Sequence, residues 1–385
     1  MDGEEKRQFS LSPSAWNRWE TCPRQYWLSR QRLPRKTGMA AALGTAVHAS
    51  IEDLIALDLS NKESAESGWL PQAMEEVLQS RWQEEKELFH VTPRHPDWKE
   101  NKIGNARKQQ RGGVELLLRH AGAPALEPRV VSVALWRRVQ SLVIACEGEL
   151  RTNDGRLMGR LDLLLADVDS SGKVTSWKVA DLKTGRTPDG ELYDTVQRQL
   201  LLYRDILLSN NVDHPPVVAE GWYTDGPKVY TAEGEPVIQQ AYDAWEKMHV
   251  TSEPMKPTIS EETCGGFCDW KAWCPHWWSW RNENGTLHSG DFADAVVLIE
   301  NIEDSGAAVI ELCEPADNQG KALPTGVAIA ATFDGKAKER MSNLLNDGHQ
   351  GPVFLGSVMT SGRAWRVGGW CDVLPWSPIP DAPQS

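Results

Sequence analysis

The sequence predicts a mixed α/β protein in which helices come first, a strand-rich body follows, and a small all-β region ends the chain. Apolar residues recur at helical spacing before residue 121, whereas alternating or β-branched runs follow from residue 130. After residue 290, short apolar segments alternate with Gly, Asp and Asn turns. A chain of 385 residues is long enough for two domains that each bury a core, and we expect them at 1–285 and 291–385.

The expected helices lie mostly in the first third of the chain. Ser12 or Ser14 can cap a helix that runs through Trp16, Trp19 and Tyr26. Apolar spacing predicts further helices over 39–59, 70–89, 103–120, 196–208 and 239–249. Helices therefore precede and then flank the strand-rich body.

The body is expected to contain strands over 130–139, 142–151, 161–166, 175–182 and 217–223. The turn Ser170-Ser171-Gly172 joins two of them as a hairpin. Later strands are expected over 295–302, 307–313, 326–332, 353–359 and 365–373, with a helix over 336–346. This order suits a small β-barrel such as an OB-fold, which often holds single-stranded nucleic acid. A protein-docking or structural module fits as well, because the segment is not basic.

Charge limits the partners of the chain. There are 41 basic and 54 acidic residues, and the net charge of -13 argues against binding polyanions over the whole surface. Basic stretches at 18–36 and 99–111 are either local phosphate contacts or solvated helix faces. The sequence has no apolar run long enough to cross a bilayer and starts without a signal peptide, so we expect no membrane partner and a cytoplasmic location.

Two aspartates fall at matching ends of the predicted hairpin. Asp162 closes Gly-Arg-Leu-Asp, and Asp181 begins Asp-Leu-Lys-Thr-Gly on the partner strand. Two carboxylates at such a short separation repel each other unless a positive charge lies between them. Mg²⁺ or Mn²⁺ would neutralise them, because hard cations prefer carboxylate and carbonyl oxygens. With the amine of Lys183, the set is typical of phosphodiester cleavage, although a lone Asp-x-Lys is also common on surface strands.

Four of the seven cysteines indicate a metal site. Cys264, Cys268 and Cys274 lie close together after the α/β body, and Cys22 lies near the start of the chain. Four thiolates suit either zinc or an iron–sulfur cube. A three-cysteine run with a remote fourth fits a cube better than the paired knuckles usual for zinc. Buried or reactive thiols are the alternative interpretation.

Five motifs occur in a fixed order along the chain: Ser12-Pro-Ser with Cys22-Pro-Arg-Gln-Tyr-Trp, Gly44-Thr-Ala-Val-His48, Gly159-Arg-Leu-Asp162, Asp181-Leu-Lys183-Thr-Gly and Gln199-Leu-Leu-Leu-Tyr203. They resemble the RecB-type branch of the PD-(D/E)XK nuclease superfamily over about residues 10–280. With its terminal cysteines, the chain is similar to the iron–sulfur members of that branch. These include the CRISPR-associated adaptation exonucleases and the nuclease domains of helicase–nuclease repair enzymes. The resemblance implies a restriction-endonuclease-like core.

The resemblance implies a role for each matching residue. The metal ligands would be His48, Asp162, Asp181 and the backbone carbonyl of Leu182. Lys183 would act with Asp162 and Asp181 in catalysis by orienting or deprotonating the attacking water. The substrate strand would be positioned by Gln199 and Tyr203, which lie one turn apart on a helix. Glu52, one turn beyond His48, would hold its imidazole.

The resemblance also implies a 4Fe–4S cluster on Cys22, Cys264, Cys268 and Cys274, with zinc as the alternative occupant. One departure concerns the spacing. Relatives usually have two residues between the first pair of the C-terminal trio, whereas Gly265, Gly266 and Phe267 fill that gap here. The glycines can take backbone angles closed to other residues and so absorb the insertion.

The implied activity is that of a metal-dependent deoxyribonuclease, with exonuclease action on single strands or DNA ends in repair or recombination. The chain has no Gly-x-x-x-x-Gly-Lys-[Ser/Thr] phosphate loop, so we expect it to supply no helicase motor itself. A helicase or recombination protein is an expected partner. The competing hypothesis is a protein that keeps the fold but binds nucleic acid or a partner without cutting.

Overall fold

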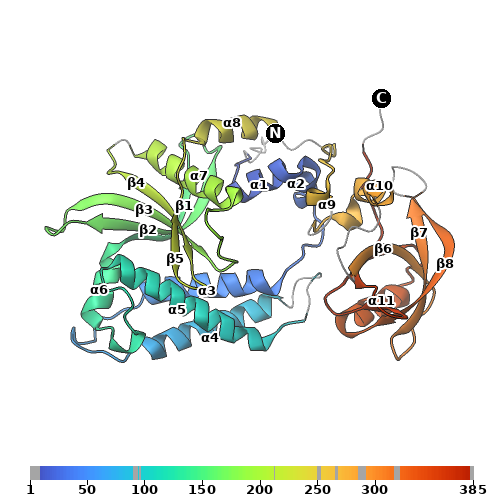
Figure 1. Ribbon diagram of the computed structural model, residues 1–385, viewed down its shortest axis with the longest axis horizontal. Coiled ribbons are helices and arrows are strands. Elements are labelled where there is room, and N and C mark those ends of the chain that lie inside the picture. The colour runs from blue at the N-terminus through green and yellow to red at the C-terminus, as the bar shows by residue number, and fades with distance from the viewer. Residues whose placement is uncertain are drawn as a thin grey trace, which may run out of the picture. The chain divides into compact units, whose positions relative to one another are not determined.

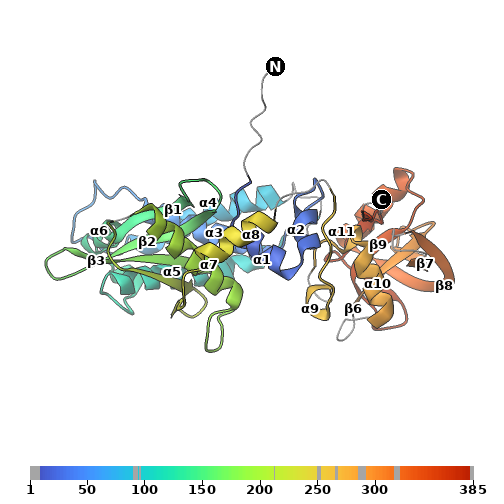
Figure 2. The same cartoon turned by 90° about the horizontal axis from the view of Figure 1, so that it is seen from above.

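The computed structural model describes residues 9–89, 94, 97–211, 213–248, 253–264, 268–284, 292–315 and 321–381. The chain forms two compact units (Figures 1 and 2). The first unit comprises Met1–Asn17, Met39–Phe89 and Lys99–His249, and the second comprises Arg18–Gly38, His90–Trp98 and Val250–Ser385. The expected domain boundary between 285 and 291 lies outside the described residues. None of the helices built from described residues is long and apolar enough to cross a membrane.

A five-stranded sheet forms the centre of the first unit (Figure 1). Its strands are, in order across the sheet, β1 (Val143–Arg151), β2 (Met158–Val168), β3 (Val174–Lys183), β4 (Val217–Tyr223) and β5 (Lys228–Thr231). Neighbouring strands are antiparallel except β3 and β4, which are parallel and connected through α7 (Asp194–Asn210). The predicted hairpin is confirmed, because Leu163 of β2 pairs with Ala180 of β3.

Helices lie on both sides of this sheet (Figure 1). One side carries α3 (Met39–Ile55), α4 (Leu70–Phe89), α5 (Ile103–His120) and α6 (Val133–Leu142), and the other carries α7 and α8 (Ile238–Lys247). The apolar face of α3 is buried, with Val47, Ile51 and Leu54 each 0 % exposed. Burial of such an apolar stripe holds the helix against the core. The polar side chains on the other face of α3 therefore start from a fixed backbone.

Two sequence predictions about local structure before residue 150 are wrong. The stretch 130–139 is not a strand, since Val133–Leu142 forms α6, whose Ser132 side chain accepts a hydrogen bond from the Leu135 amide at 3.2 Å. Its buried residues Val133, Trp136 and Val139 repeat every three positions, which outweighs the β-branched composition. The first predicted helix is divided at Cys22 into α1 (Pro13–Thr21) and α2 (Pro23–Ser29), because a residue before proline disfavours helical angles.

The end of the chain forms the predicted all-β region with one helix. Its elements are β6 (Phe292–Ile299), β7 (Ala307–Pro315), β8 (Ala322–Phe333), α11 (Gly335–Asn346), β9 (Val353–Met359), β10 (Trp365–Val367) and β11 (Asp372–Pro375). The predicted strand 365–373 is thus two short strands. The pairings β6–β7–β8–β10–β9–β6 close a ring, in which β8 and β10 are parallel. The ring encloses a buried core that includes Val297, Ile310 and Leu355.

Candidate metal centre

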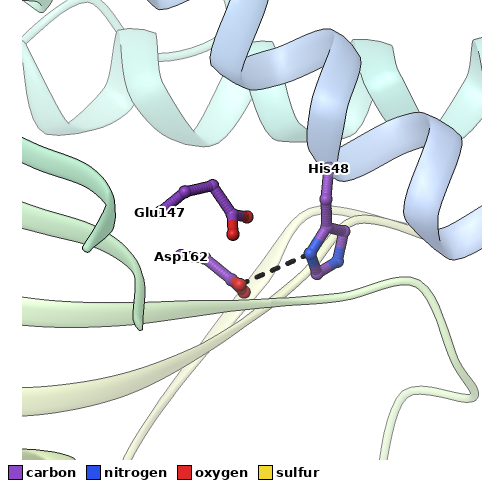
Figure 3. A group of neighbouring side chains, drawn as sticks. All are labelled: His48, Glu147 and Asp162. Atoms are coloured by element: carbon purple, nitrogen blue, oxygen red, sulfur yellow. Dashed lines mark ion pairs between the residues drawn. The ribbon is translucent and has the colours of Figure 1, made fainter. Parts of the chain in front are cut away.

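Three side chains from different elements meet at one edge of the central sheet of the first unit (Figure 3). His48 comes from α3, Glu147 from β1 and Asp162 from β2. One ligand atom from each lies within 4.8 Å of the others. His48 Nδ1 is 3.4 Å from Asp162 Oδ1. An imidazole and two carboxylates at this spacing match the donor set that proteins use for divalent cations.

The backbone explains why these side chains converge. Cys146 pairs with Leu163 and Gly148 with Leu161, so Glu147 of β1 lies across from Asp162 of β2. Glu147 has a φ of +52°, a conformation that non-glycine residues seldom adopt. Strained backbone of this kind concentrates at functional sites, where it sets the direction of a side chain.

Glycines let neighbouring elements approach the site closely. A Cβ on Gly44 of α3 would lie 2.8 Å from Thr184 Oγ1, so this glycine allows the helix that carries His48 to approach the end of β3. A Cβ on Gly159 of β2 would lie 2.3 Å from the Tyr203 ring. Both glycines belong to the motifs that end at His48 and Asp162, which explains their presence there.

Asp181 lies beside this group, at the heart of a second polar network. Its Oδ2 atom is 2.5 Å from Lys183 Nζ, and its Oδ1 accepts a hydrogen bond of 3.0 Å from the Gln199 amide. The Gln199 carbonyl accepts a bond of 3.1 Å from Lys183 Nζ, and its amide also donates to Tyr203 at 2.9 Å. The helix α7 therefore fixes both the carboxylate and the amine through one glutamine.

The two networks are joined through the backbone. The Leu182 amide donates a hydrogen bond of 2.6 Å to Asp162 Oδ2, which fixes that carboxylate against β3. Leu182 and Glu52 both line the same cavity as His48, Asp162 and Lys183. Within the described part of the chain, the polar contact of His48 is with Asp162 and not with Glu52. The expected ligand role of the Leu182 carbonyl stays a prediction.

The cavity has a volume of about 530 Å³ and is lined by residues of α3, β1, β2 and the end of β3. Arg160 also lines it and makes an ion pair of 2.6 Å with Glu147. Arg160 and Lys183 thus each neutralise one carboxylate of a crowded acidic site.

The electrostatics show how crowded the acids are. Burial and the nearby Asp162 charge raise the pKa of Asp181 to about 6, against the opposing effect of Lys183 and His48. Burial and Asp162 also raise the pKa of Glu147. Burial lowers the pKa of His48, but the surrounding carboxylates outweigh this effect and raise it overall. Desolvation and like-charge repulsion raise the pKa of the two carboxyls, and the neighbouring carboxylates raise that of the imidazole.

These residues fit a hard divalent cation. The donors are carboxylate oxygens and one imidazole, and no thiol takes part. Asp181 Oδ2 is fully buried and lies 2.5 Å from the Lys183 ammonium, so positive charge is favoured at this carboxylate.

The comparison with known protein families shows the family of the chain. The model of the PD-(D/E)XK nuclease superfamily matches residues 10–275. The chain belongs to the PD-(D/E)XK nuclease superfamily. No curated protein matches the chain. Members of this superfamily are typically metal-dependent nucleases, so membership indicates nuclease activity and a nucleic-acid substrate.

Sequence reasoning missed one residue of this candidate site. Glu147 belongs to none of the five motifs, yet it lies in the group with His48 and Asp162. Glu149 is two residues further along β1 and pairs with Arg151 at 3.1 Å, away from the group. The signal for Glu147 is its register opposite Asp162, which only the β1–β2 pairing reveals.

The second unit brings the four predicted cysteines to one small cavity, lined by Cys22, Cys264, Cys268 and Cys274. Burial raises the pKa of Cys268 to about 12 and that of Cys274 to about 11, with the other thiols contributing. Over the described residues, no three cysteine sulfur atoms lie within 4.8 Å of one another. The insertion Gly265-Gly266-Phe267 lies outside the described residues.

Tryptophans surround the cysteines. Trp27, Trp270, Trp273, Trp277, Trp278 and Trp376 form a buried cluster against which Cys264, Cys268 and Cys274 pack. Trp278 and Trp376 are tilted neighbours, with ring centroids 5.8 Å apart. Because these rings are at most 8 % exposed, they exclude solvent from the cysteine cavity and offer few faces for base stacking.

The two basic stretches offer less free positive charge than the sequence indicates. On α5, Arg107 pairs with Glu75 at 2.6 Å, and Arg111 pairs with Glu127 at 2.5 Å. In the stretch 18–36, Arg24 is completely buried. These residues are held by acidic partners or by the core, so a broad phosphate-binding face does not follow from them.

Proposed function

We propose that this chain is a divalent-metal-dependent deoxyribonuclease whose ion is Mg²⁺ or Mn²⁺. The observation that carries the proposal is the convergence of His48, Glu147 and Asp162 within 4.8 Å, with Asp181 and Lys183 beside them. His48, Asp162, Asp181 and the Leu182 carbonyl would hold the metal, with Glu147 as a further carboxylate. When bound, the ion activates a water molecule and polarises the scissile phosphate.

The protein groups supply position and charge. Lys183, fixed by Asp181 and Gln199, lies where it can orient the attacking water and offset negative charge that develops on the phosphate. Gln199 keeps the amine and the carboxylate in fixed relation, and Tyr203 is held by the same amide. Both line the approach of the substrate strand in our proposal. Glu52 completes the acidic wall of the cavity near His48.

We further propose that the substrate is single-stranded DNA or a DNA end, cut by exonuclease action in repair or recombination. The order of the five motifs supports this, because it resembles the RecB-type branch. A helicase or recombination protein would deliver the strand, since the resembling proteins include nuclease domains of helicase–nuclease repair enzymes.

The cysteines are proposed to hold a 4Fe–4S cluster. All four line one cavity, which is shielded by tryptophans. The three-cysteine run with a remote fourth supports the cube over zinc, which is usually held by paired knuckles.

The C-terminal ring of strands is proposed to be an OB-fold. The closed order β6–β7–β8–β10–β9, with α11 between β8 and β9, supports a Greek-key barrel. A hollow over β6, β7 and β8 is lined by Glu300, Glu303 and Glu311 and by small residues. Negative charge there opposes a nucleic-acid strand, so a role in protein docking or structure fits this surface better.

The nuclease proposal is tested with end-labelled DNA. Wild-type protein in Mn²⁺ should degrade single-stranded DNA to short products, and chelation should stop it. Asp181→Asn and Lys183→Ala should each lower the rate by about 100-fold or more, as when one preorganised group is removed from a catalytic site. DNA binding measured by fluorescence anisotropy without Mn²⁺ should persist in both variants. Binding without cleavage by the wild-type protein would favour the non-cutting alternative.

A further inference from the structure

Arg24 follows Cys22-Pro23 and is an arginine with no exposed surface. It lines the same cavity as the four cysteines. A buried guanidinium is costly unless its donors and its charge are all satisfied, because arginine does not lose its proton in proteins. The partners of Arg24 therefore indicate what the cavity is built to hold.

Two nitrogen atoms of Arg24 bind the last described segment of the chain. Nη1 is 2.5 Å from Asp381 Oδ1, and Nη2 donates to the Ile379 carbonyl. The remaining donor, Nε, is buried and has no hydrogen-bond partner in the described structure. One nitrogen of a charged, fully buried side chain that lines the cysteine cavity is thus left without a hydrogen-bond partner in the described structure.

The segment Trp376–Asp381 lies across the residues of the cysteine site. Trp376 packs on Trp278, and the Ile379 amide donates to the Trp273 carbonyl at 2.9 Å. Asp381 also accepts from His276 Nε2 at 3.1 Å, and His276 lines the cysteine cavity. The segment follows directly on β11, so it connects the barrel to Arg24 and His276, which line the cavity.

We propose that Arg24 is a positioning residue that couples the group bound by the four cysteines to the docking of Trp376–Asp381. Its Nε donates to a sulfur atom of the bound group, while its Nη atoms fasten Asp381 and Ile379. Four thiolates around zinc or an iron–sulfur cube keep a net negative charge, which the buried guanidinium offsets. This inference rests on the proposed cysteine site.

Coupling of this kind works in both directions. A loaded site gives Nε its acceptor and holds Arg24 in place, so Trp376–Asp381 stays docked. The docked segment in turn covers the cysteines and slows the loss or oxidation of the bound group. A stripped site leaves the Nε donor unsatisfied, and the segment should open more often.

The first test measures how long the bound group survives. Wild type, Arg24→Lys, Arg24→Gln and Asp381→Asn are loaded with iron and sulfide without oxygen, and the visible absorption is followed in air with a chelator. We expect about tenfold faster loss in both Arg24 variants and a smaller acceleration in Asp381→Asn. Arg363→Gln, which changes an exposed arginine of the same unit, should decay like wild type.

The second test follows hydrogen exchange of the Trp376 and Ile379 amides, which bond to the Pro352 and Trp273 carbonyls. In wild type, exchange should be about tenfold slower in the loaded than in the stripped protein. In Arg24→Lys, which keeps a charge but lacks the planar three-nitrogen donor, this difference should disappear. A cooperative thermal transition shows that each variant is folded. Because Arg24→Gln is prone to misfold, the coupling through Arg24 is judged on Arg24→Lys and Asp381→Asn.

The two levels of failure are distinguishable. If wild type takes up neither iron nor zinc, both the proposed cysteine site and this inference are contradicted. If wild type loads but Arg24→Lys and Asp381→Asn match it in both cluster lifetime and amide exchange, only the coupling through Arg24 is overturned.

Discussion

The backbone amide of Leu182 donates a hydrogen bond of 2.6 Å to Oδ2 of Asp162. This bond ties the carboxylate of β2 to β3, at the residue directly after Asp181. It leaves Oδ1 of Asp162 facing His48 at 3.4 Å. One oxygen of Asp162 therefore keeps the strands in register, and the other remains available for a ligand.

Glu147 should matter for metal affinity. Its carboxylate lies within 4.8 Å of the ligand atoms of His48 and Asp162, so Glu147→Gln removes one negative donor. We expect Mn²⁺ affinity measured by calorimetry to fall by about 10- to 100-fold. Glu149→Gln is the matched control on the same strand, because Glu149 is exposed and pairs with Arg151. Equal affinities in the two variants would remove Glu147 from the site.

Gln199 should act through Lys183 and Asp181, both of which it contacts. Gln199→Ala leaves the amine and the carboxylate without their common partner. The turnover number for DNA cleavage should fall by about 10- to 100-fold, with little change in the Michaelis constant. Gln197→Ala changes a residue on the same helix that bonds to the Glu233 carbonyl and should retain wild-type turnover. A rise in the Michaelis constant alone would limit Gln199 to the substrate strand and contradict its action through Lys183 and Asp181.

Metal binding should weaken in acid. Burial and Asp162 raise the pKa of Asp181 from 3.8 to about 6, so this carboxyl is protonated below that pH in the metal-free protein. A cation must displace the proton, and Mn²⁺ affinity should fall by up to about tenfold per pH unit below pH 6. The same shift makes the free energy of unfolding of the metal-free protein larger in acid. Because the pKa of Asp181 is higher in the folded than in the unfolded state, this stabilisation is fully present below about pH 4 and is lost as the pH rises through about 6. Affinity that stays constant between about pH 7 and pH 5 would contradict this account.

A glycine on α5 should be necessary for the packing behind the site. A Cβ on Gly112 would lie 2.0 Å from the Thr224 carbonyl, and the Thr224 amide donates to the Lys183 carbonyl at 3.0 Å. Gly112→Ala should therefore lower the free energy of unfolding by about 1–3 kcal/mol and reduce cleavage. Gly104→Ala on the same helix meets no atom within 4 Å and should leave stability unchanged or raise it by up to about 1 kcal/mol. Urea denaturation of both variants makes the comparison.

Much of the local structure could be predicted from the sequence, because burial enforces a simple period. The helices 70–89 and 103–120 and the strands 217–223 and 353–359 have the predicted bounds. The stretch 130–139 could not be assigned correctly, since its β-branched residues also fit a helical repeat that only packing selects.

The hairpin that carries Asp162 and Asp181 follows from alternation and a turn, whereas the place of Glu147 does not. The register shift between Val143 and Ala145 and the positive φ of Glu147 change which way that side chain points. Both are backbone features that a pattern of residue types does not encode. The division of the chain into two units drawn from interleaved segments is also set by tertiary contacts.

The central claim is that side chains from α3, β1, β2 and β3 bind one divalent cation. The most direct test is anomalous scattering from crystals of the wild-type protein soaked in Mn²⁺. The account predicts one strong peak within coordination distance of His48, Glu147, Asp162 and Asp181, and no peak there in Asp162→Ala crystals. An empty site in wild type, or a peak bound elsewhere in the first unit, would contradict it.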